Sequence, residues 1–313
     1  MKGGDTLNEG RWSKRILAVY FVLFLVFLYG SMIVMAVLAF NGPQGTISFP
    51  LKGSSFLWWE TLFNQDLPGS KAEQILDSGK NSLYLGLAAG AVTSVLALTL
   101  SMAFRRRFRG DGILFFLVLL CLMTPGFLLS LGTSFFWRWM GFAPDLWKTA
   151  LGTNVIWALP FGFLVMIAVW NRYEDTIEEG ARDLGAGALT TFREITLPLV
   201  WTGVFGTFLF GFTLSWNEYD RTALFLGGGD STLPIRIFSF TVGSVIRPDL
   251  YALGTGTTAI ALLAVLFGVV FALFRLRRRG SAVELETQVA EELGEIAGTD
   301  NGAGMASRAG SSR

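Results

Sequence analysis

The chain contains no histidine and a single cysteine, Cys121, among its 313 residues. The absence of histidine removes the usual general base and the commonest metal ligand of proteins. A lone cysteine cannot form an intrachain disulfide, and Cys121 lies in an apolar run that is typical of a small buried side chain. The sequence also lacks a phosphate-binding loop of the form G-x-x-x-x-G-K-[ST], because Gln74 stands where the first glycine before Gly79 and Lys80 would be. ATP hydrolysis by this chain is therefore not expected.

Charge is scarce as well. Charged residues make up 16% of the chain, whereas soluble domains average about 25%. Hydrophobic residues make up 52%, including 28 Phe and 10 Trp. One soluble core of this size cannot absorb so many large apolar side chains, but a lipid bilayer can. The composition therefore predicts a membrane protein.

Six apolar runs approach the length of about 20 residues that a membrane-spanning helix needs. Their continuity favours helices over the short alternating strands of a barrel. The first run is longer than the apolar part of a signal peptide and is expected to be a retained span. Pro125 and Pro160 are expected to kink or break the third and fourth runs. The runs are Ile16–Phe40, Ser82–Phe104, Ile113–Thr133, Leu151–Trp170, Leu199–Trp216 and Gly254–Phe274.

The positive charges predict the orientation. With both termini on the cytoplasmic side, 17 of the 25 Lys and Arg residues fall on that side, including the cluster Arg105–Arg109. That cluster is interpreted as a topology anchor near lipid phosphates. We expect a cytoplasmic N-terminus at residues 1–15 and a transmembrane domain at 16–279. Residues 280–313 are expected to be a disordered cytoplasmic tail.

The loop at residues 171–198 is the most informative polar segment. Residues 175–184 favour a short helix whose early acidic residues suit the positive end of the helix dipole. Gly185 can adopt the positive φ that ends such a helix. A second short helix is expected from about Leu189 to Thr196, and Pro198 suits the start of the next span. The loop is thus predicted to form a helical elbow on the cytoplasmic side.

A motif in this loop resembles the "EAA" loop of the permeases of ATP-binding-cassette (ABC) importers. Gly180 replaces the usual second alanine, a change that weakens the helix by up to about 1 kcal/mol. In that family the loop contains the coupling helix that docks on the ATPase subunit. The resemblance implies that Glu179 lies in the docking contact and that Gly185 makes the turn. The matching positions are Glu179, Gly180, Ala181, Gly185, Ile195, Leu197 and Pro198.

The resemblance covers roughly residues 11–279 and implies the fold of a binding-protein-dependent ABC importer permease in the bacterial inner membrane. It implies a second permease subunit (a heterodimer), two ATP-binding subunits and an extracytoplasmic solute-binding protein as partners, and no nucleic acid. It also implies that this chain binds no cofactor, because ATP and Mg²⁺ belong to the partner ATPase.

The segment after the fifth run is similar to the polyamine-type branch of the family, and most to its second permease. Trp216, Asn217, Glu218, Tyr219 and Asp220 lie there, followed by a Thr-Leu-Pro step that ends at Pro234. Ionisable groups at membrane depth suggest a transport pathway. A cation could be held by the two acids against the two aromatic faces, but these residues also suit an interfacial aromatic belt. Asn217 replaces the usual acid and Arg221 adds a positive charge, so the substrate within the branch stays open.

Two alternatives remain at this point. Within the family, ferric iron, a thiamine-like cation, an opine or another small solute could replace a polyamine as substrate. A secondary transporter would need ionisable residues inside the spans, and the first, second, third and sixth runs have almost none. A membrane-embedded enzyme is disfavoured, because no span contains a pair of acids and the chain has no histidine.

Overall fold

The computed structural model describes residues 5–43, 53–64, 71–106, 108–225, 230–242 and 248–274, with side chains from residue 12 onward. The expectation of an all-helical protein is confirmed over these residues, whose only extended pairing is an isolated bridge between Asn41 and Ser54. The expected tail at 280–313 lies outside them. The helices are α1 (Asp5–Leu38), α2 (Leu57–Phe63), α3 (Ala72–Ala103), α4 (Asp111–Met123), α5 (Gly126–Trp139), η1 (Leu146–Ala150), α6 (Leu151–Trp170), α7 (Thr176–Asp183), α8 (Ala188–Thr191), η2 (Phe192–Thr196), α9 (Leu197–Trp216), α10 (Leu233–Val242) and an unlabelled helix at Pro248–Phe274.

Among the described residues, five helices are long and apolar enough to cross a membrane, and six if one bent pair counts as a single span. The helices extend beyond several predicted runs. α3 begins at Ala72 rather than near Ser82, because helical hydrogen bonding continues past the end of the apolar run. Polar contacts hold this extension, including hydrogen bonds from Asn81 Nδ2 to the Ser231 carbonyl (3.2 Å) and from Arg236 Nε to Ser78 Oγ (3.2 Å).

The third predicted run, Ile113–Thr133, is broken at Pro125, where a kink or a break was expected. The run forms α4 and α5, which are bent by 110° at the break between them. Thr124 is extended, with ψ of 124°, because a residue before proline avoids the helical conformation. Pro125 also has no N–H to donate to the preceding turn. Pro160 behaves differently, since α6 continues through it.

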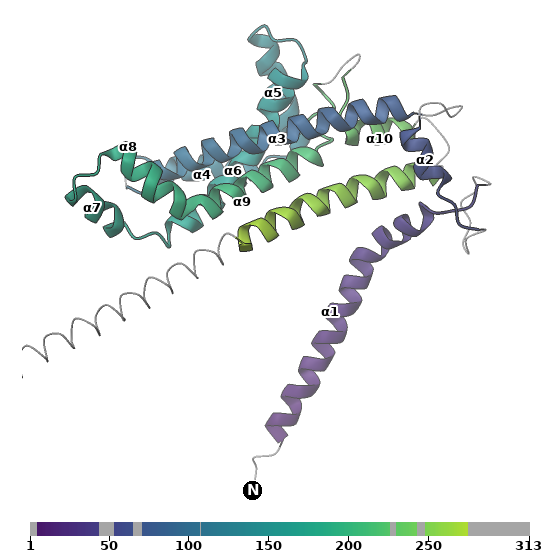
Figure 1. The fold of residues 1–313 in the computed structure, drawn as a ribbon, viewed down its shortest axis with the longest axis horizontal. Coiled ribbons are helices and arrows are strands. Elements are labelled where there is room, and N and C mark those ends of the chain that lie inside the picture. The colour runs from purple at the N-terminus through teal and green to yellow at the C-terminus, as the bar shows by residue number, and fades with distance from the viewer. Residues whose placement is uncertain are drawn as a thin grey trace, which may run out of the picture. The chain divides into compact units, whose positions relative to one another are not determined.

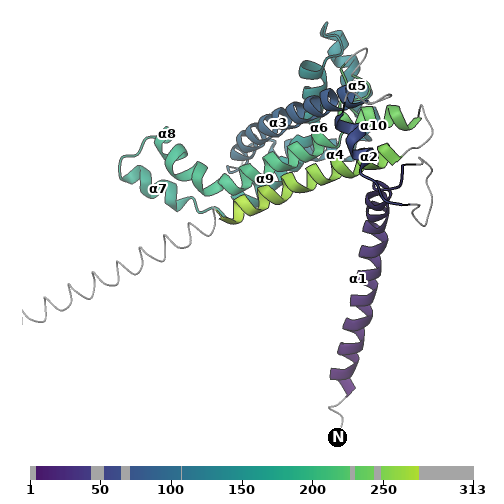
Figure 2. The same cartoon turned by 45° about the vertical axis from the view of Figure 1, so that its right-hand side comes forward.

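The core of the protein is formed by α3, α6 and α9, which lie side by side in Figures 1 and 2. Small residues allow the close approach of α3 and α9. A Cβ atom added at Gly211 would lie 2.9 Å from the Cα of Gly90. Membrane helices associate through such small residues, because lipid offers no hydrophobic drive between helices. Phe163, Met166 and Val200 are fully buried in this core.

The two ends of this core carry different elements. Figures 1 and 2 show α7 and α8 at one end of α3, α6 and α9, and α2 and α10 at the other. The chain divides into a unit up to Leu263 and a second unit from Ala264, of which the helix up to Phe274 is described. All sites discussed below lie within the first unit.

Candidate functional site

The first half of the loop 171–198 forms the predicted helix and turn. α7 spans Thr176–Asp183, close to the expected limits. Gly185 has φ of +89°, and the Ala186 N–H donates to the Ala181 carbonyl across the turn (3.0 Å). This left-handed conformation is the one that glycine adopts at little cost. Leu184 precedes the turn and is 92% exposed, so the elbow presents an apolar tip to its surroundings.

The second half of the loop differs from the prediction. A separate short helix from Leu189 to Thr196 was expected, but one helix runs from Ala188 to Trp216 without interruption. It contains a π-helical turn at Phe192–Thr196, where the Leu197 N–H donates to the Phe192 carbonyl. Pro198 is the second residue of α9, which begins at Leu197. The wider turn accommodates a proline, whose missing N–H breaks the regular bonding pattern.

The motif residues divide between an exposed group and a packed group. Glu179, Gly180 and Gly185 are exposed, and a Cβ atom at Gly180 would meet nothing within 4 Å. Ala181 is half-buried. Ile195, Leu197 and Pro198 are half-buried at the base of α9. The exposed group therefore lies on the elbow, while the packed group anchors the elbow to the helix core.

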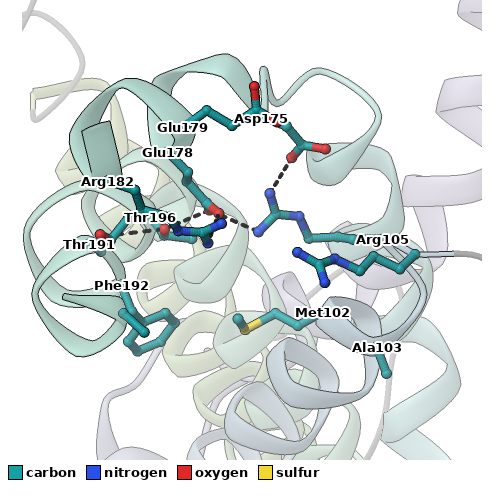
Figure 3. Close-up of a pocket in the computed structure, with 12 residues that line it drawn as sticks. Met102, Ala103, Arg105, Asp175, Glu178, Glu179, Arg182, Thr191, Phe192 and Thr196 are labelled. Carbon is teal, nitrogen blue, oxygen red and sulfur yellow. Dashed lines mark hydrogen bonds and ion pairs between the residues drawn. The ribbon is translucent and has the colours of Figure 1, made fainter. Parts of the chain in front are cut away.

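The buried residue of α7 is Glu178 rather than Glu179. Its Oε1 accepts hydrogen bonds from Thr196 Oγ1 (2.7 Å), Arg105 Nη1 (2.8 Å) and the Tyr173 hydroxyl (2.9 Å). Arg182 approaches the other carboxylate oxygen at 3.3 Å. Figure 3 shows the head groups of Arg105, in the turn after α3, and Glu178, on α7, pointing toward one another. One carboxylate thus holds both ends of the loop, since Tyr173 precedes α7 and Thr196 precedes α9.

These contacts keep Glu178 ionised. Burial by itself would raise the pKa of Glu178, but the hydrogen bonds from Arg105, Thr196 and Tyr173 outweigh it and hold the pKa below its ordinary value. Arg105 also bonds Asp175. The Arg105 side chain is 15% exposed and the Asp175 side chain 67% exposed. The pair with Glu178 is therefore mostly buried, and the pair with Asp175 lies at the surface.

A cavity of about 510 Å³ lies beside this network. Arg105, Glu178 and Glu179 contribute to its wall, and Phe192 and Met102 provide its apolar side (Figure 3). Within the described residues, no group of His, Cys, Asp and Glu could hold a metal ion. The arrangement is suited to holding a surface loop in one position.

Sequence reasoning missed both Glu178 and Arg105. Glu178 directly precedes Glu179. Only Glu179 matches the motif, so no sequence pattern indicated a role for Glu178. Arg105 was interpreted with its neighbours as a topology anchor, and nothing local distinguishes it from Arg106. The signal is tertiary, because the pair joins residues 73 positions apart.

The candidate pathway residues at the other end of α9 are only partly brought together. Trp216, Asn217 and Tyr219 line a cavity of about 340 Å³. Phe238 of α10 lines the same cavity, with its ring centroid 4.5 Å from that of Tyr219. Glu218 and Asp220 are not among its described lining residues. Asp220 is exposed.

Glu218 points into a different environment. It is buried and forms an ion pair with Arg221, whose backbone N–H donates to Glu218 Oε1 (2.8 Å). The Arg221 guanidinium lies over the Trp157 ring, 3.8 Å from its centroid. It also packs against Gly126 at the start of α5, where a Cβ atom would lie 3.0 Å from Arg221 Nη2. Arg221 thus pairs with the Glu218 carboxylate and covers the Trp157 ring, so neither group is open to a bound cation.

Comparison with curated proteins shows relatives that cover most of the chain. The spermidine/putrescine transport system permease protein PotC of Haemophilus influenzae is 27% identical over 76% of this chain and 88% of its own length. PotC of Escherichia coli K12 is 26% identical over 77% of this chain and 87% of its own. The putrescine transport system permease protein PotI of the same strain is 26% identical over 76% of this chain and 83% of its own.

Solved structures show the same fold. A bacterial ABC transporter involved in the import of the acidic polysaccharide alginate matches with a TM-score of 0.62 and 16% identity, over 84% of this chain and 96% of the other. The alginate transporter in complex with an alginate pentasaccharide-bound periplasmic protein matches with a TM-score of 0.58 and 17% identity, over 87% and 96%. At this level of identity the likeness concerns the fold.

The family comparison covers the end of α3, then α6, the loop 171–198, α9 and the helices that follow. Residues 95–278, more than half of the chain, match the family described as the inner membrane component of binding-protein-dependent transport systems. The match agrees with the apolar helices of membrane-spanning length. This chain therefore belongs to the family of binding-protein-dependent transport system inner membrane components, the permease subunits of ABC importers.

Proposed function

We propose that this chain lines the translocation pathway of an importer for a polyamine-type cation and couples it to a separate ATPase through the loop 171–198, called the coupling loop from here on. The observation that carries the proposal is the exposed elbow of α7, with Glu179 and Leu184 at the surface and Glu178 locked beneath them. A rigid exposed elbow fits a cleft in a partner. ATP and Mg²⁺ would bind that partner, since this chain has no phosphate loop.

The proposed assembly contains a second permease subunit, two ATP-binding subunits and an extracytoplasmic solute-binding protein. The permease family supports this assembly, because its members depend on a binding protein. Closure of the two ATPases would draw the coupling loops together and rock the spans between inward-facing and outward-facing states. The elbow then lies on the cytoplasmic side, as the positive charges predict.

A polyamine is the proposed substrate because the curated relatives are permeases for spermidine and putrescine. The cavity lined by Trp216, Tyr219 and Phe238 supports this choice, since aromatic faces attract ammonium groups. Arg221 neutralises Glu218 nearby. We therefore propose that this chain contributes aromatic faces to the pathway, and that the charge of a polyamine is balanced mainly by other subunits.

The test is ATP hydrolysis by the complete complex in lipid, stimulated by substrate-loaded binding protein. Glu179→Arg should abolish the stimulation, because a reversed charge opposes docking of the elbow. Glu174→Arg is the matched control, since Glu174 is an exposed acid of the same loop outside α7. It should retain most of the stimulation.

A panel of solutes then decides the substrate. Stimulation by spermidine- or putrescine-loaded binding protein supports the polyamine proposal, whereas stimulation by ferric iron, a thiamine-like cation or an opine replaces it. If no ATPase co-purifies with the chain and Glu179→Arg behaves as the parent, the importer proposal fails. Uptake driven by a cation gradient in the chain alone would then identify a secondary transporter.

A further inference from the structure

The coupling loop is joined through the chain to only two of the three core helices. It leaves α6 after Trp170 and continues into α9 at Leu197. A displacement of α7 therefore reaches α6 and α9 through the backbone. α3 is the third core helix. It ends at Ala103, and the chain passes through α4, α5 and α6 before it reaches the loop. Packed helices can slide past one another, so packing alone does not determine whether α3 follows α7.

Arg105 supplies a link between α3 and the coupling loop. Arg105 lies in the turn directly after α3, and its side chain extends to Glu178 of α7, at 2.8 Å. The guanidinium also lies 4.6 Å from the ring centroid of Trp170 and 4.8 Å from that of Tyr173. Trp170 in turn donates from Nε1 to Ser101 Oγ of α3 (2.9 Å). The end of α3 is thus held to the end of α6 and to α7 by directional contacts.

The ion pair of Arg105 and Glu178 is expected to persist when α7 moves. Hydrogen bonds between charged groups are shorter and stronger than neutral ones. Glu178 is buried and remains ionised because four donors surround its carboxylate, namely Arg105, Tyr173, Thr196 and Arg182. Removing one partner of a buried pair is costly, so the link resists separation when α7 moves. Arg106 offers a contrast, because it is exposed and forms no ion pair within the described part of the chain.

We propose that Arg105 is a positioning residue for energy coupling, which joins α3 to the coupling loop so that α3 moves with α7, α6 and α9 as one body. The inference rests on the proposed function, since the partner ATPase supplies the displacement of α7. It predicts that loss of Arg105 leaves the docking of the ATPase intact. The docked ATPase should then drive less transport, because α3 no longer follows α7.

The first experiment compares Arg105→Gln with Arg106→Gln in the complete complex. Both changes remove one positive charge from the same cluster, so effects on membrane topology are matched. Arg105→Gln should lower the substrate-stimulated ATP hydrolysis and the transport about tenfold, a typical size for a residue on a coupling route. The amount of co-purified ATPase should stay unchanged. Arg106→Gln should remain within about twofold of the parent, as surface charges usually do.

The second experiment measures movement directly. Spin labels are placed at Thr99→Cys of α3 and Thr176→Cys of α7, both exposed, in a Cys121→Ser background. In the parent, the distance between the labels should be the same in the resting and the ATP-trapped states. In Arg105→Gln it should differ between the two states. A role in stability alone would not produce a state-dependent distance.

Each outcome decides one claim. Equal stimulation in Arg105→Gln and Arg106→Gln, or a parent distance that already changes between states, overturns the role of Arg105 and leaves the importer proposal standing. Absence of stimulation in the parent complex overturns the importer proposal instead. If Arg105→Gln fails to assemble, Arg105→Lys decides. It keeps the charge, but its ammonium cannot reproduce the contacts of the planar guanidinium with Glu178, Trp170 and Tyr173 together. It should therefore assemble and show partial stimulation, and full stimulation would refute the link.

Discussion

Two buried pairs of glutamate and arginine lie at opposite ends of the helix core, and they differ in reach. Glu218 and Arg221 are three residues apart and stabilise a turn after α9. Glu178 and Arg105 are 73 residues apart and join α7 to the turn after α3, two segments that are not adjacent in the chain. Burial raises the pKa of the Glu218 carboxyl although Arg221 acts in the opposite direction, whereas the pKa of Glu178 is lowered. The same two residue types thus form a local brace at one end and a long-range link at the other.

The largest expected effect on stability is at the local pair. Glu218→Leu leaves Arg221, with a side chain 12% exposed, without its carboxylate. Removing one partner of a buried pair costs about 3–5 kcal/mol. The variant should show a clearly lower apparent midpoint of thermal unfolding in detergent. The double variant Glu218→Leu/Arg221→Leu should recover most of the loss, because apolar replacement of a buried pair is often neutral. A double variant as unstable as the single one would show that Arg221 has a further role.

At the long-range pair we expect a small loss of stability and a large loss of stimulated ATP hydrolysis. Glu178→Gln still offers an oxygen to Thr196 and Tyr173, and Arg105 keeps Asp175. The cost in stability should be only about 1–3 kcal/mol, the range for one charged hydrogen bond. Substrate-stimulated ATP hydrolysis should nevertheless fall more in Glu178→Gln than in Glu218→Gln, measured in the same complex. The opposite order would remove the distinction between a link and a brace.

The pH dependence should separate the pairs further. The pKa of Glu178 is lowered on folding, so its stabilising contribution is present above the unfolded value of about 4.3 and is lost as pH falls through the folded pKa. The pKa of Glu218 is raised, so the parent loses stability relative to Glu218→Gln as pH rises above about 4.3. Unfolding midpoints of parent and Gln variants across pH measure both. Parallel curves for the two sites would contradict the assigned directions.

The smallest effect is expected at Asp175. Asp175→Asn removes the exposed partner of Arg105, and surface ion pairs contribute no more than about 1 kcal/mol. Stability and stimulated ATP hydrolysis should both stay close to the parent. If Asp175→Asn loses as much stimulated ATP hydrolysis as Glu178→Gln, the pair of Arg105 and Asp175 would be the one that links α3 to α7. Thermal unfolding and the ATPase assay on one preparation are sufficient to decide.

Much of the fold was predictable because its signals are local. Hydropathy located each membrane-spanning segment, since a bilayer rewards continuous apolar runs wherever they occur. Gly185 was predicted as a turn and has the expected positive φ, because that conformation depends on the residue itself. The break at Pro125 was weighed as a kink, and the run was still predicted as one span. Hydropathy cannot distinguish a bent span from a straight one, because both halves are apolar.

The candidate site was predictable only in part for the same reason. Glu179 was identified by its spacing to Gly185, Leu197 and Pro198, and its exposure suits docking. Asp220 and Glu218 were grouped with Trp216 and Tyr219 because they adjoin in sequence. The structure separates them, since consecutive residues after a helix end point in different directions and Arg221 draws Glu218 inward.

The amino-acid sequence by itself determined that this protein is built from apolar helices of membrane-spanning length, and the motif spacing in residues 171–198 resembled the permease family that the comparison then showed, because both signals act within short segments. Only the tertiary structure decided that Arg105 meets Glu178 and that Arg221 occupies Glu218 and Trp157. The physical reason is packing. The close approach of α3 and α9 at Gly90 and Gly211 sets where the end of α3 lies relative to α7, and no local pattern encodes that distance.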